Sequence, residues 1–184
     1  MRIPLIAILL ISIAKLETKE PSFNLIKKDG KVEIREYPPY IIAKTSLDIS
    51  KNKEDNNMFR VLANYIFGGN SNSQSIPMTA PVITHANSNS YDMIFFMLDA
   101  NTIESLPSPN NNNISIEKLH IGKAITISFG MWATERRVKK YKSKLDEYIL
   151  KNKIQVVSDI MVAQYNSPWT IPPFRKNELI YKIK

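Results

Sequence analysis

The sequence contains no cysteine, so it can form no disulfide, bind no metal through thiolates and offer no thiolate nucleophile. Histidine is scarce as well: His85 and His120 are the only two, and each falls in or beside an expected loop, so we predict no metal site. The GxSxG, HExxH, phosphate-loop and dinucleotide-binding patterns are all missing. Carboxylates on the expected strands, such as Glu33 and Glu178, have basic neighbours and are expected to form surface ion pairs. We therefore expect a protein that is not an enzyme.

Acidic residues are also in short supply. Lysine and arginine total 25 against 17 aspartates and glutamates, which gives a formal net charge of +8. A basic protein favours anionic partners, including membrane surfaces and ligands that carry carboxylates, but its charge does not choose among them. The most basic segment, residues 136–153, belongs to an expected helix whose exposed face mixes in Asp146 and Glu147 and lacks aromatic residues suited to stacking on bases, so we expect no nucleic-acid partner.

The longest hydrophobic run lies at the N-terminus, at residues 3–14, between Arg2 and a polar segment. Its twelve residues would rise only about 18 Å as a helix. The hydrocarbon core of a bilayer is about 30 Å thick. We therefore predict that residues 1–14 are a signal peptide cleaved after Ala14, which makes the protein secreted or periplasmic. An uncleaved membrane anchor and a buried first strand are the alternatives, and residues 15–30 are expected to form an N-terminal extension.

The rest of the chain, residues 31–184, has the hydrophobic content and length of a single domain. In its first half, apolar residues that alternate or run continuously predict four strands, at residues 31–37, 41–49, 76–84 and 91–98. Between the second and third strands, apolar residues at three- and four-residue spacing predict a helix of about three turns that ends at Gly68. Asp55 or Asn56 is its expected N-cap.

The second half repeats this order after a proline- and asparagine-rich connection at residues 107–113. Its strands are expected at residues 114–119, 123–131, 156–165 and 178–183. A helix from Glu135 to about Lys151, with Thr134 as N-cap, separates them into pairs. We therefore predict a monomeric α+β protein. Its fold is a distorted antiparallel β-barrel built from two pseudo-repeated halves, residues 31–106 and 114–184, each with one packed helix.

Six segments resemble successive signature blocks of the SOUL/haem-binding protein family, in the family's order: EIREYPPYIIAKT (33–45), FRVLANYIFGGN (59–70), IPMTAPV (76–82), LPSPN (106–110), ISFGMWA (127–133) and AQYNSPWTIPPFRKNELIYKI (163–183). The resemblance implies one SOUL-type domain over residues 31–184. It also implies a non-enzymatic carrier or buffer of a tetrapyrrole, which is haem or another porphyrin. The ligand would lie in a cleft between the first helix and the loop before the last strand.

A haem is a flat apolar disc with two carboxylates at one edge, so its site needs apolar walls, basic groups at the mouth and usually an axial ligand. Within the cleft that the resemblance implies, the candidate cofactor-binding residues are Met58, Phe59, Arg60, Leu62, Ala63, Trp169, Phe174, Arg175 and Lys176. The apolar candidates also fit a hydrophobic core, and the basic ones also fit ordinary surface charges. No histidine belongs to the segments of the resemblance, so free porphyrin should bind about as well as haem. The alternative function is a binding module for another hydrophobic or amphipathic ligand, a membrane surface or a protein partner.

Overall fold

The computed structural model describes residues 18–48, 57–87, 90–167 and 169–184, so the expected signal peptide and the expected N-caps Asp55 and Asn56 lie outside the described residues. The strands of the described chain are β1 (Asn24–Asp29), β2 (Val32–Tyr37), β3 (Tyr40–Asp48), β4 (Val82–Ala86), β5 (Ser90–Phe96), β6 (Ile114–Leu119), β7 (Gly122–Gly130), β8 (Met161–Gln164) and β9 (Lys176–Lys182). The helices are α1 (Met58–Ile66), α2 (Glu135–Lys151) and the short 3-10 turns η1 (Ile103–Ser105) and η2 (Pro172–Phe174).

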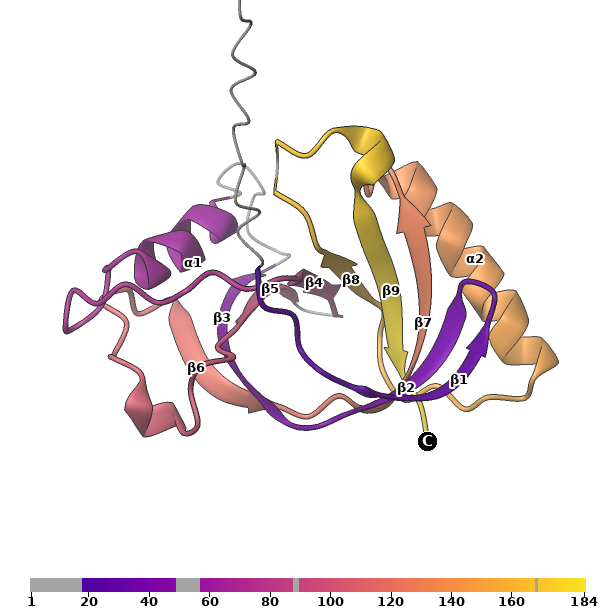
Figure 1. Cartoon of the computed structure of the whole chain (residues 1–184), viewed down its shortest axis with the longest axis horizontal. Helices are drawn as coiled ribbons and strands as arrows, with labels where there is room; N and C mark the ends of the chain where they lie inside the picture. The colour runs from indigo at the N-terminus through magenta and orange to yellow at the C-terminus, as the bar shows by residue number, and fades with distance from the viewer. Residues whose placement is uncertain (1–17, 49–56, 88–89, 168) are drawn as a thin grey trace, which may run out of the picture.

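All these strands form one antiparallel sheet in the order β1-β2-β7-β9-β8-β4-β5-β3-β6. The sheet curls on itself, and its two edge strands, β1 and β6, are not paired with each other in the described chain (Figure 1). The α+β class is therefore confirmed, while the expected barrel is a curled half-barrel. The opening lies between β6 and β1, the strand that pairs with the outer edge of β2.

The two halves of the chain interleave in this sheet. After β1, the element order is strand, strand, helix, strand, strand, and this order occurs twice. Strand β2 of the first half pairs with β7 of the second, and β6 of the second half pairs with β3 of the first. This exchange joins the halves into one sheet. The exchange does not show that the two halves have equivalent structures, so the pseudo-repeat stays a prediction.

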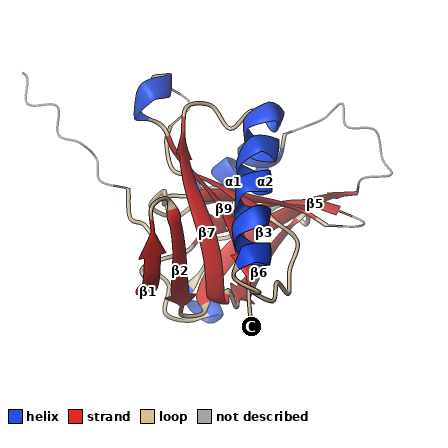
Figure 2. Cartoon of the chain, turned by 90° about the vertical axis from the view of Figure 1, so that its right-hand side faces the viewer, coloured by secondary structure: helices blue, strands red, loops and turns tan. Residues whose placement is uncertain are grey.

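Each helix buries one apolar stripe against the outer face of the sheet. In α1 the spacing of Leu62, Tyr65 and Ile66 places these side chains against β3 and β5, where they are fully buried. Helix α2 lies along β7 and β9 with Leu145 at the centre of its buried stripe (Figure 2). Thr134 holds the N-cap position of α2 as predicted, although its side chain makes no capping hydrogen bond.

A third apolar cluster fills the inner face of the curled sheet. Successive residues of a strand point to opposite faces, so Ile41 and Ala43 of β3 pack under α1 while Ile42 points inward. There it joins side chains from six other segments, among them Phe96 and Ile180. Strands β3 and β9 are therefore buried on both faces where their sequences are apolar, at residues 41–43 and 179–181.

Three expected elements need correction. Residues 24–29, expected in an extension, form β1, whose side chains are all exposed and therefore show no apolar alternation. The strand expected at residues 76–84 is shortened to β4, because Pro77 and Pro81 interrupt it. The strand expected at residues 156–165 is shortened to β8, and Val156 makes only an isolated bridge to Ile183.

A buried ion pair crosses the sheet on its inner side. Arg35 of β2 donates two hydrogen bonds to the carboxylate of Glu178 of β9, at 2.8 and 2.9 Å. Arg35 also donates to the hydroxyl of Tyr37 at 2.9 Å, and the hydroxyl of Tyr165 donates to Glu178 at 2.6 Å. The network therefore links β2 to β9 across β7, which lies between them, and Tyr165 extends it to the end of β8. Glu178 was expected to form an ion pair at the surface. This expectation is wrong, because Glu178 is almost completely buried.

The network changes the proton affinities of its members. Burial by itself lowers the pKa of Arg35, but the hydrogen bonds and charge of Glu178 outweigh this effect and raise it. Burial raises the pKa of Tyr37 to about 12. Burial also raises the pKa of Tyr165, and the neighbouring charge of Glu178 raises it further. The fold therefore holds Arg35 charged and both hydroxyls protonated.

Removing one partner of the buried pair should destabilise the protein strongly. We expect Glu178→Gln to lower the free energy of unfolding by about 3 kcal/mol, because it removes the fully buried counterion of Arg35 and leaves only its partly buried ion pair with Glu33. Urea denaturation followed by circular dichroism measures this. The matched control is Glu117→Gln in the exposed Lys44–Glu117 pair, which should cost about 1 kcal/mol or less. Equal losses in the two variants would contradict the assigned role of the network.

The protein should also lose stability at alkaline pH. Tyrosine in an unfolded chain ionises near pH 10. The pKa values of Tyr37 and Tyr165 are raised in the folded state, so their contribution is complete below about pH 10. It is lost as the pH rises toward the pKa of Tyr37, about 12. Tyrosinate absorbance and circular dichroism, recorded together, should show late ionisation that coincides with unfolding. Ionisation of all eight tyrosines near pH 10 in a chain that stays folded would refute this.

Candidate ligand-binding site

Helix α1 divides its candidate residues between the core and the surface. Met58 and Leu62 are both buried, as the core interpretation of the apolar stripe requires, and Leu62 packs against the sheet. Phe59 and Arg60 are exposed on the outer side, and Ala63 is half-buried beside them. The ring of Phe59 meets the ring of Phe95 edge-on at 5.5 Å between centroids. The outer side of α1 can therefore offer Phe59, Ala63 and Arg60 to a ligand.

The segment between β8 and β9, residues 165–175, carries most of the other candidates. Trp169 and Phe174 are highly exposed, with 92% and 72% of their surface accessible. Lys176, the first residue of β9, is exposed as well. Its Nζ lies 3.8 Å from the ring centre of Tyr165 and 3.1 Å from a carboxylate oxygen of Glu20.

Arg175 differs from the other basic candidates because it is buried, with 6% of its surface accessible. Its guanidinium donates to the backbone oxygens of Thr170 at 2.9 Å and Ser167 at 3.0 Å. It also lies 3.5 Å from the ring centre of Trp132, in the loop that follows β7. Arg175 therefore fixes the backbone of its own loop and joins it to a neighbouring one. Arg60 and Lys176 remain as the exposed basic candidates.

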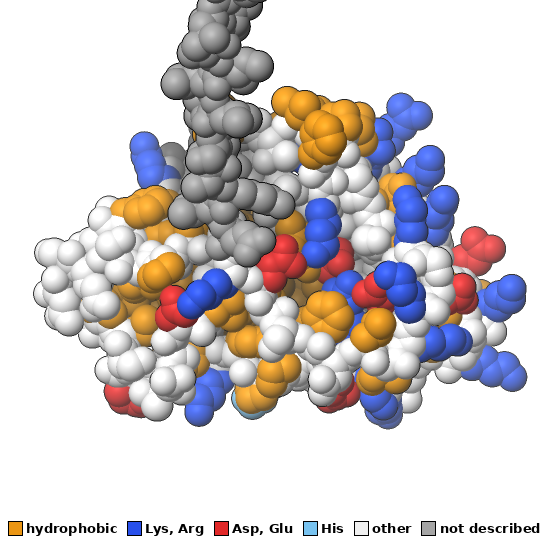
Figure 3. All heavy atoms as spheres, in the orientation of Figure 1, with side chains coloured by type: hydrophobic (Ala, Val, Ile, Leu, Met, Phe, Trp, Pro, Cys, Tyr) orange, Lys and Arg blue, Asp and Glu red, His pale blue; other side chains and the backbone are white. Residues whose placement is uncertain are grey.

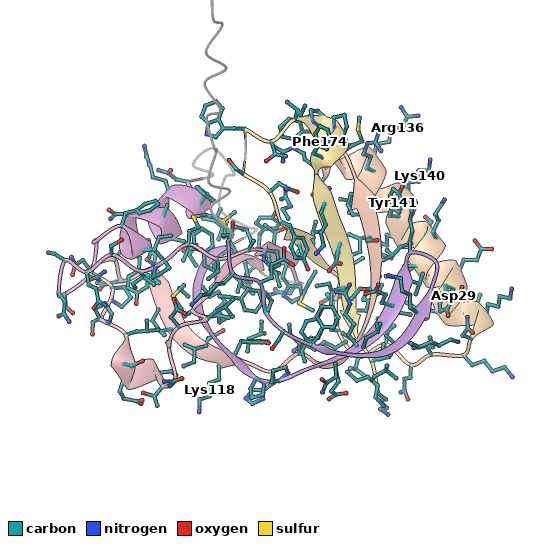
Figure 4. All side chains as sticks on the ribbon, viewed as in Figure 1. Asp29, Lys118, Arg136, Lys140, Tyr141 and Phe174 are labelled. Atoms are coloured by element: carbon teal, nitrogen blue, oxygen red, sulfur yellow. The ribbon has the colours of Figure 1, made fainter. Side chains whose placement is uncertain are left out.

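Helix α1 and the 165–175 segment both lie on the upper side of the sheet, where Phe174 projects at the tip (Figures 1 and 4). The structure thus places the two elements of the expected cleft at one end of the molecule. The two best-defined hollows of the described residues are lined by no candidate residue. Phe59, Trp169 and Phe174 are exposed, so a ligand held between α1 and the segment would contact exposed side chains.

The larger hollow is a groove of about 680 Å³ beside the C-terminal half of α2. Its apolar walls come from α2, from residues 153–160 and from the ends of β4 and β9: Ala86, Ile149, Leu150, Ile154, Val156, Ile160 and Tyr181. At its rim Lys142 forms an ion pair with Asp146 at 2.7 Å, and this bond raises the pKa of Lys142. The sequence did not predict this groove, because segments distant in sequence form it. The second hollow, of about 160 Å³, lies between residues 74–77 and 97–106.

Both histidines lie outside the expected cleft. His85 belongs to β4, and its Nε2 is buried without a hydrogen-bond partner among the described residues. His120 lies in the turn between β6 and β7, and its backbone oxygen accepts a bond from Lys182. In the described ranges, no group of histidine, aspartate and glutamate side chains is arranged to hold a metal ion. No helix of those ranges is both long and apolar enough to cross a membrane.

The fold is similar to those of several solved structures. A hydrolase from Listeria innocua superimposes with a TM-score of 0.62 at 9% identity, over 84% of this chain and 92% of that one. The C-terminal domain of EcmrR gives a TM-score of 0.65 at 8% identity, over 83% and 96% of the two chains. EcmrR in a complex with DNA gives 0.63 at 11% identity, over 83% of this chain and 57% of that one. At these identities the likeness shows a shared fold alone.

Among curated proteins, no relative matches the sequence. The family model described as SOUL heme-binding protein matches residues 18–182. This range includes every strand and helix described above, from β1 to β9. It agrees with the six segments on which the sequence resemblance rested. The chain therefore belongs to the SOUL heme-binding protein family.

Proposed function

We propose that this protein binds a tetrapyrrole, either haem or a free porphyrin, as a non-enzymatic carrier or buffer. The observation that carries the proposal is the family match, which extends over the whole described sheet and both helices. Tetrapyrrole binding accords with the net charge of +8, since these ligands carry carboxylates.

The apolar part of the proposed site is formed by exposed side chains on two elements. Phe59 and Ala63 lie on the outer side of α1, and Trp169 lies in the 165–175 segment. Binding is favourable when a flat apolar ligand covers exposed aromatic rings, because apolar surface is removed from water. A tetrapyrrole between these elements would remove both faces of its ring from water.

The basic part of the proposed site is formed by Arg60 and Lys176. Both side chains are exposed and can reach carboxylates in solvent. Lys176 is paired with Glu20, but both members of this pair are about half exposed. Exposed pairs contribute about 1 kcal/mol or less, so the exchange of Glu20 for a ligand carboxylate costs little.

Iron coordination by histidine has no part in this proposal. Neither α1 nor the 165–175 segment contains a histidine, and Met58 is buried under α1. Affinity would then come from apolar contact and from carboxylate pairing, which haem and metal-free porphyrin share. The two ligands should bind with similar affinity.

We further propose that the protein acts outside the cytosol, after cleavage of residues 1–14. The support is the sequence pattern of a short apolar run between Arg2 and a polar segment. Mass spectrometry of the exported protein should then give a chain that starts at Lys15. A full-length mass from the same fraction would refute cleavage.

A second candidate function is the binding of a different amphipathic ligand, and the groove beside α2 favours it. A volume of about 680 Å³ is within the range of small-molecule sites. Apolar walls with lysines at the rim suit an apolar molecule with an anionic group. Ile160→Ser should then weaken binding, whereas variants on α1 should not.

Titration of the purified protein with haem and with metal-free porphyrin tests the tetrapyrrole proposal. We expect saturable one-to-one binding, followed by the Soret band and by tryptophan fluorescence. Phe59→Ser and the double variant Arg60→Ala/Lys176→Ala should each weaken binding about tenfold, which corresponds to about 1.4 kcal/mol.

Matched controls distinguish the loss of a specific site from a general effect of removing exposed aromatic or basic side chains. Phe67→Ser removes an exposed phenylalanine just past the other end of α1, and Lys27→Ala/Lys118→Ala removes two exposed charges elsewhere. These controls should bind like the unmodified protein. Binding that does not saturate at micromolar ligand would refute the tetrapyrrole proposal. An equal loss of affinity in variants and controls would refute the assigned site.

A further inference from the structure

An exposed apolar patch covers the tip of the molecule next to the N-terminus of α2. We call it the apical patch, and its members come from the loop after β7 and from the 165–175 segment: Met131, Trp132, Trp169, Ile171 and Phe174. Figure 3 shows hydrophobic side chains gathered at this end. Ile171 alone has 60% of its surface accessible. Large apolar side chains grouped on a surface in this way mark a site of contact.

The exposure of the patch is fixed by buried polar side chains. Arg175 holds the backbone of the 165–175 segment through the carbonyls of Ser167 and Thr170, and it stacks on Trp132. Asn177, which is fully buried, donates to the backbone oxygen of Met131 at 2.8 Å. The two loops are therefore held together from below, and their apolar side chains cannot all turn inward to the core.

Proline adds stiffness to the same loop. Pro172 and Pro173 form most of η2, and each has its φ angle restricted by its ring. Phe174 closes this turn with a backbone hydrogen bond to Ile171. A preorganised apolar tip loses little conformational entropy when it is covered.

Unpaired basic residues surround the patch on the side of α2. The first two turns of α2 carry Arg136, Arg137, Lys139 and Lys140 against a single acid, Glu135. In the described chain none of these four basic side chains forms an ion pair. Figure 4 places Arg136 beside Phe174 at the tip and Lys140 one turn below.

The chemistry of this end fits a lipid surface better than a protein. Tryptophan favours the boundary between headgroups and acyl chains, and lysine or arginine near an anionic membrane contributes about 1 kcal/mol per residue. A stable protein interface buries about 800 Å² on each partner. The apical patch is instead a narrow projection above the strands, as both ribbon views show (Figures 1 and 2). A projection of this shape inserts into a fluid bilayer but leaves little flat area for a rigid partner.

We propose that the apical patch docks this protein onto anionic phospholipid membranes. Trp132, Ile171 and Phe174 enter the boundary between headgroups and acyl chains. The basic residues of the first two α2 turns contact the headgroup phosphates. This docking needs no bound tetrapyrrole, although Trp169 belongs both to the apical patch and to the proposed tetrapyrrole site.

Tryptophan fluorescence gives a direct readout of the insertion. The chain has two tryptophans, Trp132 and Trp169, and both belong to the patch. The purified full chain is mixed, without tetrapyrrole, with vesicles of phosphatidylcholine alone or with phosphatidylserine, both carrying brominated acyl chains. We expect quenching and a blue shift with the anionic vesicles, and a marked loss of both at high salt. Binding through residues 3–14 alone would leave the tryptophans unquenched.

Two variants with matched controls test the residues. Ile171→Ser/Phe174→Ser and Arg136→Glu/Lys140→Glu should each reduce vesicle affinity at least about tenfold. Their controls make changes of the same kind on β1 and β6, in Leu25→Ser/Ile26→Ser and Lys27→Glu/Lys118→Glu. The controls should be quenched like the unmodified protein, and circular dichroism should confirm that all variants fold.

Three results would overturn the proposal. The first is an absence of quenching with anionic vesicles, which would leave the patch as a surface for a protein partner. The second is quenching of equal strength with neutral and anionic vesicles. The third is an equal loss in patch variants and controls.

Discussion

The buried ion pair between Arg35 and Glu178 is the interaction on which the sheet depends. Its two residues are 143 positions apart and belong to different halves of the chain. Each charge is costly to bury alone, and the hydrogen bonds that Glu33, Tyr37 and Tyr165 add to the pair help to offset this cost. These bonds form together in one register of β2, β8 and β9. A shift of β9 by one residue would turn Glu178 to the other face, so the network disfavours the alternative pairings that an open sheet allows.

The same end of β9 connects this core to the functional loops. Of the four polar residues 175–178, three are buried, Arg175, Asn177 and Glu178, and only Lys176 is exposed. Glu178 binds the network, whereas Arg175 and Asn177 bind backbone carbonyls of the loops above it. Buried donors of this kind cost free energy unless every bond is made. The loop geometry is therefore as strongly determined as the sheet, although its side chains face solvent.

The sequence predicted local patterns well and distant contacts poorly. Helix α2 was predicted at its observed bounds, because its apolar stripe and its charged outer face repeat with the helical period. Strand β1 was missed since it buries neither face, and a strand without buried residues leaves no alternation to find. The pairing of Glu178 with Arg35 could not be inferred, because the sequence around Glu178 carries no sign of an arginine in the other half of the chain. The groove beside α2 was missed for the same reason.

In the candidate site, the type of a residue did not reveal whether the folded chain would bury or expose it. Trp169 and Phe174 were recognised as aromatic residues in a proline-rich loop, a pattern that fits a lid over the core as well as an exposed contact. Their exposure depends on Arg175, which residue type alone suggested as a ligand contact and which the structure places under the loop. The two proposals then fit one physical scheme. Apolar ligands partition into bilayers, and a tip that docks on a bilayer brings the adjoining side of the 165–175 segment to the interface. A tetrapyrrole could pass between the membrane and that segment without exposing its whole ring to water.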